Sequence, residues 1–202
     1  MAEPTSRFSA TASLPGRRPA ATAVPAAVLT CDAVATEAER LAHFLIRRQV
    51  FVIEQGLFGG AAGAAGAHGA TGATGAHGAA GAYGAYGDTD AHDDDPATIH
   101  VVGRADETIC GTVRLYPLDV PGRWKGDRLA VLAGYRNLGL GAPLVRFAVR
   151  SAGLAGGREM EAFIQPANVA FFRWLGWRRT GDLVEYAGMP HQRMLIDLAG
   201  QG

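Results

Sequence analysis

The stretch GYRNLGLGAPLVRF (residues 134–147) places two glycines, Gly139 and Gly141, between an expected strand and an expected helix. The strand is predicted over residues 127–134 (DRLAVLAG), and the helix over residues 142–155 (APLVRFAVRSAGLA), whose apolar residues fall on one face. Glycines at such a turn let backbone N–H groups converge on an anion at the helix N-terminus. The stretch therefore predicts a phosphate-binding loop.

Two common phosphate loops do not fit this stretch. A P-loop needs Gly-Lys-Ser/Thr, whereas Ala142-Pro143-Leu144 follows the second glycine. A dinucleotide fingerprint needs a third glycine at the position of Leu144. What remains is the pattern R-x-x-G-x-G-A over residues 136–142, in which Arg136 adds a positive charge.

The rest of the chain alternates between strand and helix patterns. An amphipathic helix is predicted at 37–52, a hairpin at 98–106 and 108–118, a short helix at 167–176, and further strands at 27–31, 159–164 and 193–199. This interleaving predicts an α/β (α+β) fold around a mixed sheet.

Composition limits the function classes. The chain has 202 residues with 19 basic and 19 acidic side chains, so no global charge favours nucleic acid or an anionic membrane. The only cysteines, Cys31 and Cys110, form no CxxC pair, which argues against a disulfide framework and a zinc site. No run reaches 18 apolar residues. We expect a soluble cytoplasmic protein with no metal and no membrane or nucleic-acid partner.

Two segments lack the composition of a packed core. Residues 1–24 are interpreted as a disordered leader. From Gly60 to Gly87 every third residue is glycine, but there is no proline, which excludes collagen. Gly, Ala and Thr bury too little apolar surface to offset the entropy of ordering them. We therefore expect a single domain over 25–199, with 59–87 inserted as a flexible loop.

The R-x-x-G-x-G-A loop resembles the acyl-CoA pyrophosphate loop of the GNAT superfamily, the Gcn5-related N-acetyltransferases. Four other segments are similar to a bacterial GNAT subgroup: IRRQVFVIEQG (46–56), ICGTVRLYPL (109–118), QPANVAFFRWLGW (165–177) and AGMPHQRM (187–194). The likeness spans about residues 28–198 apart from the insertion. A fainter resemblance is to GNATs encoded in nitrilase gene clusters.

This resemblance implies a mostly antiparallel mixed sheet, flanked by helices and splayed at the acyl-CoA site. It implies acetyl-CoA as co-substrate, attacked directly by an acceptor amine in a ternary complex. The backbone of Leu129 and Val131 would pair with the pantetheine arm, and Asn168 would reach its thioester end or instead cap a helix. The pyrophosphate would lie on the loop formed by Arg136, Asn137, Leu138, Gly139, Leu140, Gly141 and Ala142.

The acid–base residues are less clearly marked. Glu54, expected across the splayed sheet from the phosphate loop, is the first candidate base. Asp93, in the acidic run of residues 92–95, is the second unless that run binds a cationic acceptor; Asp94 and Asp95 also suit a solvated loop. Many relatives have a tyrosine where this chain has Phe172. Tyr186 and His191 are the alternative proton donors, beside solvent, although His191 also suits a hydrogen-bonded turn.

Three residues are expected to bind the acceptor: Arg114, Tyr116 and Glu54. Arg114 suits a bidentate contact with a carboxylate of the acceptor. Two other functions remain open. The RRQVF segment also resembles acyl-homoserine-lactone synthases, which would make the protein a longer-chain N-acyltransferase. The missing tyrosine also fits a non-catalytic acyl-CoA-binding module. The acceptor's identity and a homodimer are left open.

Overall fold

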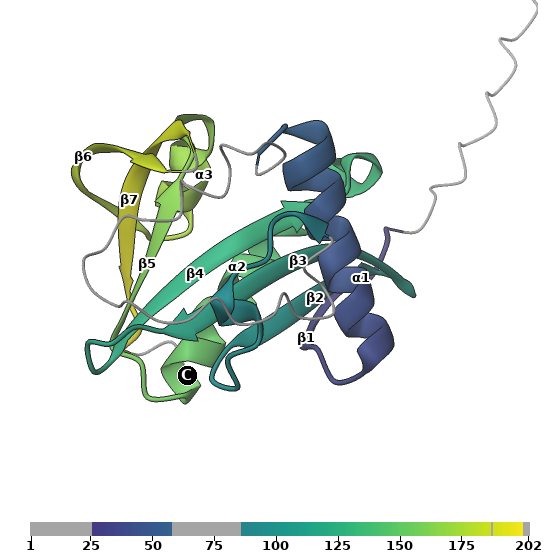
Figure 1. The fold of residues 1–202 in the computed structure, drawn as a ribbon, viewed down its shortest axis with the longest axis horizontal. Helices are drawn as coiled ribbons and strands as arrows, with labels where there is room; N and C mark the ends of the chain where they lie inside the picture. Colours follow the sequence, from purple (N-terminus) through teal and green to yellow (C-terminus); the bar gives the residue numbers. More distant parts are fainter. Residues whose placement is uncertain (1–25, 58–85, 187, 200–202) are drawn as a thin grey trace, which may run out of the picture.

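The structure, a computed structural model, describes residues 26–57, 86–186 and 188–199 (Figure 1). The predicted leader and nearly all of the predicted insertion lie outside the described residues. The strands are β1 (Leu29–Ala33), β2 (Ile99–Ala105), β3 (Thr108–Pro117), β4 (Arg123–Val131), β5 (Glu159–Ile164), β6 (Arg178–Tyr186) and β7 (Met189–Asp197). The α-helices are α1 (Glu37–Arg47), α2 (Gly141–Leu154) and α3 (Val169–Trp174). Shorter turns are the π-helical η1 (Arg48–Glu54) and the 3₁₀ turns η3 (Ala91–Asp93), η4 (Ala133–Leu138) and η5 (Pro166–Asn168).

The strands form one sheet in the order β1-β2-β3-β4-β5-β7-β6. Every neighbouring pair is antiparallel except β4 and β5. That parallel pair spans only Arg123–Lys125 of β4 and Glu159–Glu161 of β5. The strands then separate, so the sheet is splayed at its centre. The predicted mostly antiparallel, helix-flanked sheet is confirmed.

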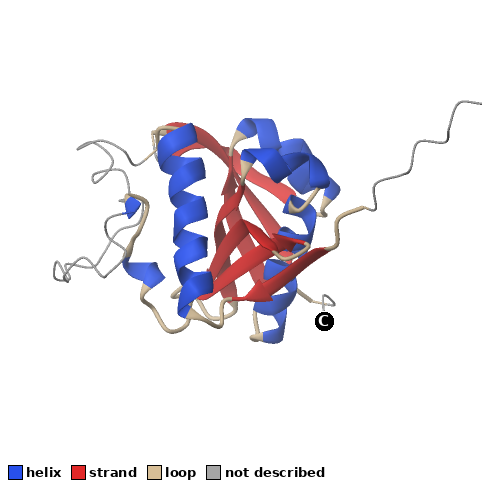
Figure 2. Ribbon diagram, turned by 90° about the vertical axis from the view of Figure 1, so that its right-hand side faces the viewer, coloured by secondary structure: helices blue, strands red, loops and turns tan. Residues whose placement is uncertain are grey.

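Helices cover both faces of the sheet (Figure 2). Thr36 and Glu39 form a capping box at the start of α1, since each side chain accepts a hydrogen bond from the other's backbone N–H. The predicted helix 37–52 is α-helical only to Arg47 and continues as the wider π-helical turn η1. This turn carries the chain to Glu54.

The N-terminus of α2 is held close to the sheet by two glycines of β2 and β3. A Cβ atom on Gly111 would lie 2.8 Å from Leu144 Cδ1, and one on Gly103 would lie 3.0 Å from Leu144 Cδ2. Leu140 and Leu144 are fully buried in the core cluster. Larger side chains at either glycine would therefore displace the turn that precedes α2.

Some predicted boundaries were wrong. Strand β4 begins at Arg123 rather than residue 127, and β7 begins at Met189 rather than residue 193. Strand β6 was not predicted, because it lies at the sheet edge with mostly exposed residues and has no apolar alternation. The hairpin β2–β3 and strand β5 match the prediction closely. Within the described residues, no helix is long and apolar enough to span a membrane.

Candidate active site

A cavity of about 150 Å³ lies where β4 and β5 separate. Its apolar wall comes from the α2 side of the sheet and includes Val145, Ala148, Met160 and Ala162. Its polar lining is formed by Gln55, Asp127, Arg128, Gln165, Asn168, Tyr186 and His191. The lining therefore combines apolar surface with polar groups.

A β-bulge at Arg128 bends β4 beside this cavity. Asp127 pairs with Arg114 and Ala130 pairs with Thr112, so Arg128 and Leu129 together face the single residue Val113. Arg128 has a φ of +52°, a left-handed conformation that costs a non-glycine residue about 1–2 kcal/mol. Its guanidinium is held by Asp88 O and Asp90 Oδ2, each 3.1 Å from Nη2. These contacts stabilise the strained residue that turns β4 away from β5.

The glycine-containing loop lies between β4 and α2. Gly139 has a φ of +80° and ends η4, and α2 begins at Gly141. A Cβ atom on Gly139 would meet no atom within 4 Å, so the surface above the loop is open. Arg136 Nε donates to Val131 O over 2.9 Å, and its Nη2 is ion-paired with Glu54. The loop therefore presents an open backbone surface and a guanidinium next to the end of β4.

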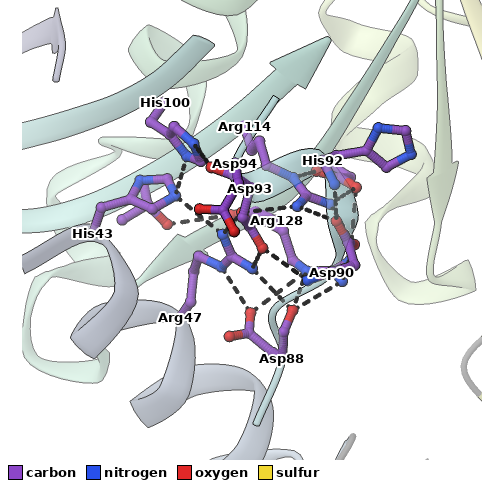
Figure 3. A network of polar contacts seen from close by, with 12 residues as sticks. His43, Arg47, Asp88, Asp90, His92, Asp93, Asp94, His100, Arg114 and Arg128 are labelled. Carbon is purple, nitrogen blue, oxygen red and sulfur yellow. Dashed lines mark hydrogen bonds and ion pairs between the residues drawn. The ribbon is translucent and has the colours of Figure 1, made fainter. Parts of the chain in front are cut away.

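A buried ion-pair network lies on the other side of β4 (Figure 3). The side chains of Arg47 and Arg114 are both 0% exposed. Arg47 binds Asp88 over 2.7 Å and Asp93 over 2.5 Å. Arg114 binds Asp90 and Asp127, each over 2.7 Å. Together with Arg128, this network fastens residues 88–93 to α1, β3 and β4.

The arginines keep the buried aspartates ionised. Burial alone would raise the pKa of Asp93, but the hydrogen bond from Arg47 and the charges of Arg47 and Arg114 outweigh burial and hold that pKa well below its usual range. The pKa of Asp127 is lowered against burial in the same way by Arg114 and Arg128. Both oxygens of Asp93 already accept hydrogen bonds from Arg47. Asp93 is therefore poorly suited to take a proton from a substrate.

Replacing Arg47 with methionine is expected to lower the free energy of unfolding by about 3–5 kcal/mol, because Asp88 and Asp93 would remain buried without their partner. Thermal and urea unfolding measure this loss. The matched control is Arg48→Met, which removes the same charge from the next, partly exposed residue. Equal stability of the two variants would contradict the structural role of the network.

Two buried histidines, His43 and His100, pack against the network. His43 Nδ1 donates to Val101 O over 3.2 Å, because a carbonyl can only accept. Burial lowers the pKa of His100 to about 4, although its contact with the Asp93 carbonyl opposes this shift. Burial also lowers the pKa of His43, helped by the charge of Arg47. Both rings are therefore neutral near pH 7.

These histidines predict an acid-sensitive fold. In the unfolded chain His100 takes up a proton near pH 6.5, whereas in the folded protein its pKa is about 4. The contribution of His100 to the free energy of unfolding is therefore fully present above this pH range and is lost as the pH falls through it. The loss from His100 is expected to reach about 3 kcal/mol, and His43 acts in the same direction. Urea unfolding at several pH values measures the slope. His100→Asn should flatten it, whereas exposed His92→Asn should not; an unchanged slope in His100→Asn would contradict this explanation.

Four of the candidate site residues predicted from the sequence line the cavity: Leu129, Asn168, Tyr186 and His191. Asn168 occupies the N-cap position of α3, but its side chain makes no capping hydrogen bond. The alternative interpretation of Asn168 as a helix cap is therefore not supported. Phe172 lines the same cavity as Tyr186, which reaches it from β6. A phenol therefore lines the same cavity as Phe172.

The expected position of Glu54 was wrong. It does not lie across the sheet from the phosphate loop, because its carboxylate is ion-paired with Arg136 of that loop. The hydrogen bond from Arg136 lowers the pKa of Glu54. The α-helical periodicity of the sequence predicts the face of the helix on which Glu54 lies. The π-helical turn η1 changes that periodicity before Glu54 is reached.

The residues expected to bind the acceptor lie elsewhere. Among the described residues, the cavity lining does not include Glu54, Asp93, Arg114 or Tyr116. Arg114 is buried in the ion-pair network. The ring of Tyr116 stacks on that of His92, with their centroids 3.9 Å apart. Asp127 and Arg128 reach the lining instead, and sequence reasoning missed them. A bulge has no simple apolar pattern, so nothing in the sequence marked it.

Comparison with known proteins agrees with this geometry. A family model described as the acetyltransferase (GNAT) family matches residues 76–177. The fold is similar to a putative N-acetyltransferase from Lactobacillus plantarum, with a TM-score of 0.64 and 20% identity over 85% of this chain and 99% of the other. It is similar to an acyl-CoA N-acyltransferase from Pseudomonas aeruginosa, with a TM-score of 0.61 and 21% identity over 84% and 98%. It is also similar to BjaI, a CoA-dependent acyl-homoserine lactone synthase, with a TM-score of 0.59 and 17% identity over 82% and 79%. The comparison with curated proteins gave no match.

Proposed function

The chain belongs to the GNAT family of acetyltransferases, and from this premise we propose that it transfers an acetyl group from acetyl-CoA to the amine of a small acceptor. The observation that carries the proposal is the cavity between the separating strands β4 and β5, next to the open glycine-containing loop. A glycine-containing loop that suits phosphate, beside a cavity with both apolar and polar lining residues, fits a donor with a charged tail and an acyl-bearing arm.

We propose that residues 136–142 bind the pyrophosphate of the donor. The positive end of α2 and the guanidinium of Arg136 both attract anions. Beyond Lys125, the β5-facing edge of β4 has no strand beside it in the described sheet. The backbone from Leu129 to Val131 is then available to pair with the pantetheine arm as an added strand does. Asn168, in the cavity lining, supplies an amide near the thioester end.

Acyl transfer to an amine needs a base for the ammonium proton, and we propose His191. Its Nδ1 is 2.9 Å from Met189 O, and a carbonyl can only accept, so Nδ1 carries the proton. The neutral ring then has its lone pair on Nε2. His191 is buried and lines the cavity, so that lone pair belongs to a group within the proposed site.

The leaving thiolate needs a proton, and we propose Tyr186 as its donor. The Tyr186 hydroxyl accepts a hydrogen bond from Arg128 Nη1 over 3.4 Å, which leaves its own proton free to be donated. The Tyr186 ring packs edge-on against His191, with centroids 5.4 Å apart. Phe172, in the same lining, has no proton to give.

The role of Glu54 can be decided with one variant. If Glu54 chiefly neutralises Arg136, Glu54→Gln frees the guanidinium for the pyrophosphate and should raise CoA affinity about two- to fivefold, the range expected for an exposed ion pair. Calorimetric titration with CoA measures this change. Gln49→Ala, which alters another partner of Glu54 and keeps its charge, is the control. A fall in turnover of about 10²–10⁴-fold without a change in affinity would instead make Glu54 the base.

A thiol-release assay tests the proposed activity. Purified protein is incubated with acetyl-CoA and a panel of small amines, including amino acids and polyamines, and free CoA is followed against a no-acceptor control. We expect acceptor-dependent release of CoA and an acetylated product by mass spectrometry. CoA binding without turnover on every amine would favour a non-catalytic acyl-CoA-binding module.

A longer acyl group is a second candidate, favoured by the apolar wall of the cavity. Val145, Ala148 and Met160 belong to this wall. An engineered apolar cavity of the same 150 Å³ holds benzene, so the space exceeds what an acetyl methyl group requires. The neighbours named for acyl-CoA N-acyl transfer and acyl-homoserine lactone synthesis share the fold. Comparing acetyl-, butyryl-, hexanoyl- and decanoyl-CoA in the same assay decides between these donors.

We place this activity in the cytoplasm. Cys31 and Cys110 are free thiols, which agrees with a reducing compartment. The balanced charge of the chain offers no general attraction to nucleic acid or an anionic membrane. The proposed partners are therefore the acyl-CoA donor and the amine acceptor.

A further inference from the structure

The sequence contains a single lysine, and it lies where β4 and β5 separate. Of the 19 side chains that are lysine or arginine, only Lys125 is a lysine. Lys125 is the last residue of β4 that pairs with β5, opposite Glu161. The next two residues along β4, Gly126 and Asp127, line the cavity. Lys125 therefore lies at the edge of the cavity, where the gap between the two strands begins.

Two aromatic rings of the cavity lining hold the ammonium group of Lys125. Its Nζ lies 5.0 Å from the centroid of the Phe163 ring and 5.1 Å from that of the Tyr186 ring. These rings stack on each other with their centroids 5.4 Å apart, and both residues line the cavity. The ring of His191, the proposed base, packs against the same Tyr186 ring at a centroid distance of 5.4 Å. The cation and the proposed base are thus neighbours of one ring.

The carboxylates near Lys125 in the sheet are bound by arginines. Asp127, two residues along β4, accepts hydrogen bonds from Arg114 on both oxygens, over 2.8 and 2.7 Å. Glu161, opposite Lys125 on β5, is ion-paired with one arginine of β4 and one of β7. Lys125 itself forms no ion pair with any residue that the structure describes. Aromatic faces stabilise a cation but do not neutralise it, so the half-buried ammonium still favours a bound anion.

We propose that Lys125 binds the carboxylate of the acceptor, and that the acceptor is therefore an amino acid rather than a simple amine or a polyamine. The inference rests on the proposed function. The acceptor amine lies beside His191, and the carboxylate reaches past the Tyr186 ring to Lys125 Nζ, which donates a charge-assisted hydrogen bond to it. A polyamine brings a second positive charge toward this ammonium, so like-charge repulsion disfavours it.

Lys125 takes the role that the sequence suggested for Arg114. Arg114 was expected to contact an acceptor carboxylate, but its buried guanidinium binds Asp90 and Asp127. Lys125 lies on the neighbouring strand, opposite Tyr116. A lysine ammonium is a compact charge on a flexible stem, so it can turn from the aromatic rings to a carboxylate without breaking an ion pair. The acceptor class therefore depends on Lys125, outside the buried ion-pair network.

Matched pairs of acceptors test this inference in the thiol-release assay. Each member of a panel of L-amino acids is compared with its amide, which keeps the amine and loses the negative charge. For the preferred amino acid we expect a kcat/KM about tenfold or more above that of its amide, as for a hydrogen bond to a charged group. Lys125→Met should abolish this preference, mainly by raising KM for the amino acid, and should leave the amide unchanged. Lys125→Arg keeps the charge and should retain most of the preference.

Arg123→Met is the matched control, because Arg123 lies two residues earlier on the same face of β4. Its guanidinium is already paired with Glu159 and Glu161, so the variant should keep the preference for the amino acid. Equal wild-type kcat/KM for amino acids and their amides would overturn the inference. An equal loss on both kinds of acceptor in Lys125→Met would overturn it as well, because Lys125 would then have a structural role.

A labelling experiment tests the carboxylate site without turnover. Lys125 is the only side-chain amine in the sequence, so trinitrobenzenesulfonate modifies it and the N-terminal amine, and peptide mass spectrometry separates the two. With CoA present, N-acetylated amino acids should slow the modification of Lys125, whereas their amides should not; neither probe has a free amine that consumes the reagent. Equal protection by both probes, or by neither, would contradict the inference. If acetyl transfer itself fails, no amine releases CoA, yet protection by the carboxylate probes alone still supports the site.

Discussion

Aspartate in place of Gly139 is expected to abolish acyl-CoA binding, with a loss of about 100-fold or more. The side chain would enter the open space above the loop, where a Cβ atom meets nothing within 4 Å, and its carboxylate would repel the pyrophosphate. The fold should survive, because Asp tolerates the left-handed conformation found at this position better than most residues do. Calorimetric titration with CoA measures the loss.

Gly139→Asn is the matched control, since asparagine has nearly the same shape and the same tolerance of positive φ without the charge. We expect it to bind CoA more weakly than the wild type but much more tightly than Gly139→Asp. Circular dichroism and thermal unfolding of both variants check that the loop change leaves the fold intact. Wild-type CoA affinity in Gly139→Asp would remove the assignment of this loop to phosphate.

Glutamine in place of His191 is expected to lower turnover by about 10²–10⁴-fold, the contribution of a positioned acid–base group. The variant lacks a group at this position that can take the ammonium proton. CoA affinity should change little, since His191 lines the cavity and is not part of the loop of residues 136–142. Steady-state rates and calorimetric titration with CoA measure the two effects.

Two variants test whether this effect is specific to His191. His92→Gln changes a histidine that stacks on Tyr116 outside the cavity lining and should keep the wild-type rate. Tyr186→Phe removes only the hydroxyl and should lower turnover, because the leaving thiolate then loses its proposed proton donor. A wild-type rate in His191→Gln would exclude His191 as the base and return that role to Glu54 or to solvent.

The fold followed from the sequence because its strongest patterns are local. The loop at Gly139 and Gly141, the hairpin β2–β3 and strand β5 each depend on neighbouring residues, and each is found where it was expected. The resemblance to GNAT proteins also predicted that the sheet is splayed. Strand β6 was not predicted, because an edge strand with exposed side chains has no apolar alternation that marks it in the sequence.

The site was harder to predict because it depends on contacts between distant segments. Arg114 was expected to bind an acceptor, but Asp90 and Asp127 occupy its guanidinium. Glu54 was expected far from the phosphate loop, but it pairs with Arg136, 82 residues along the chain. Neither pairing is visible in local sequence. By contrast, Tyr186 and His191 were named because they lie near the last strand of the sequence, and both line the cavity.

The most direct test of the proposed acyl-CoA site is a crystal structure of the protein with bound acetyl-CoA. The pyrophosphate should lie on the loop of residues 136–142, and the pantetheine should run along β4 beside Leu129 and Val131. The thioester should then enter the cavity that contains Tyr186 and His191. Acetyl-CoA bound outside the space between β4 and β5, or with its pyrophosphate away from Gly139, would contradict the proposed site.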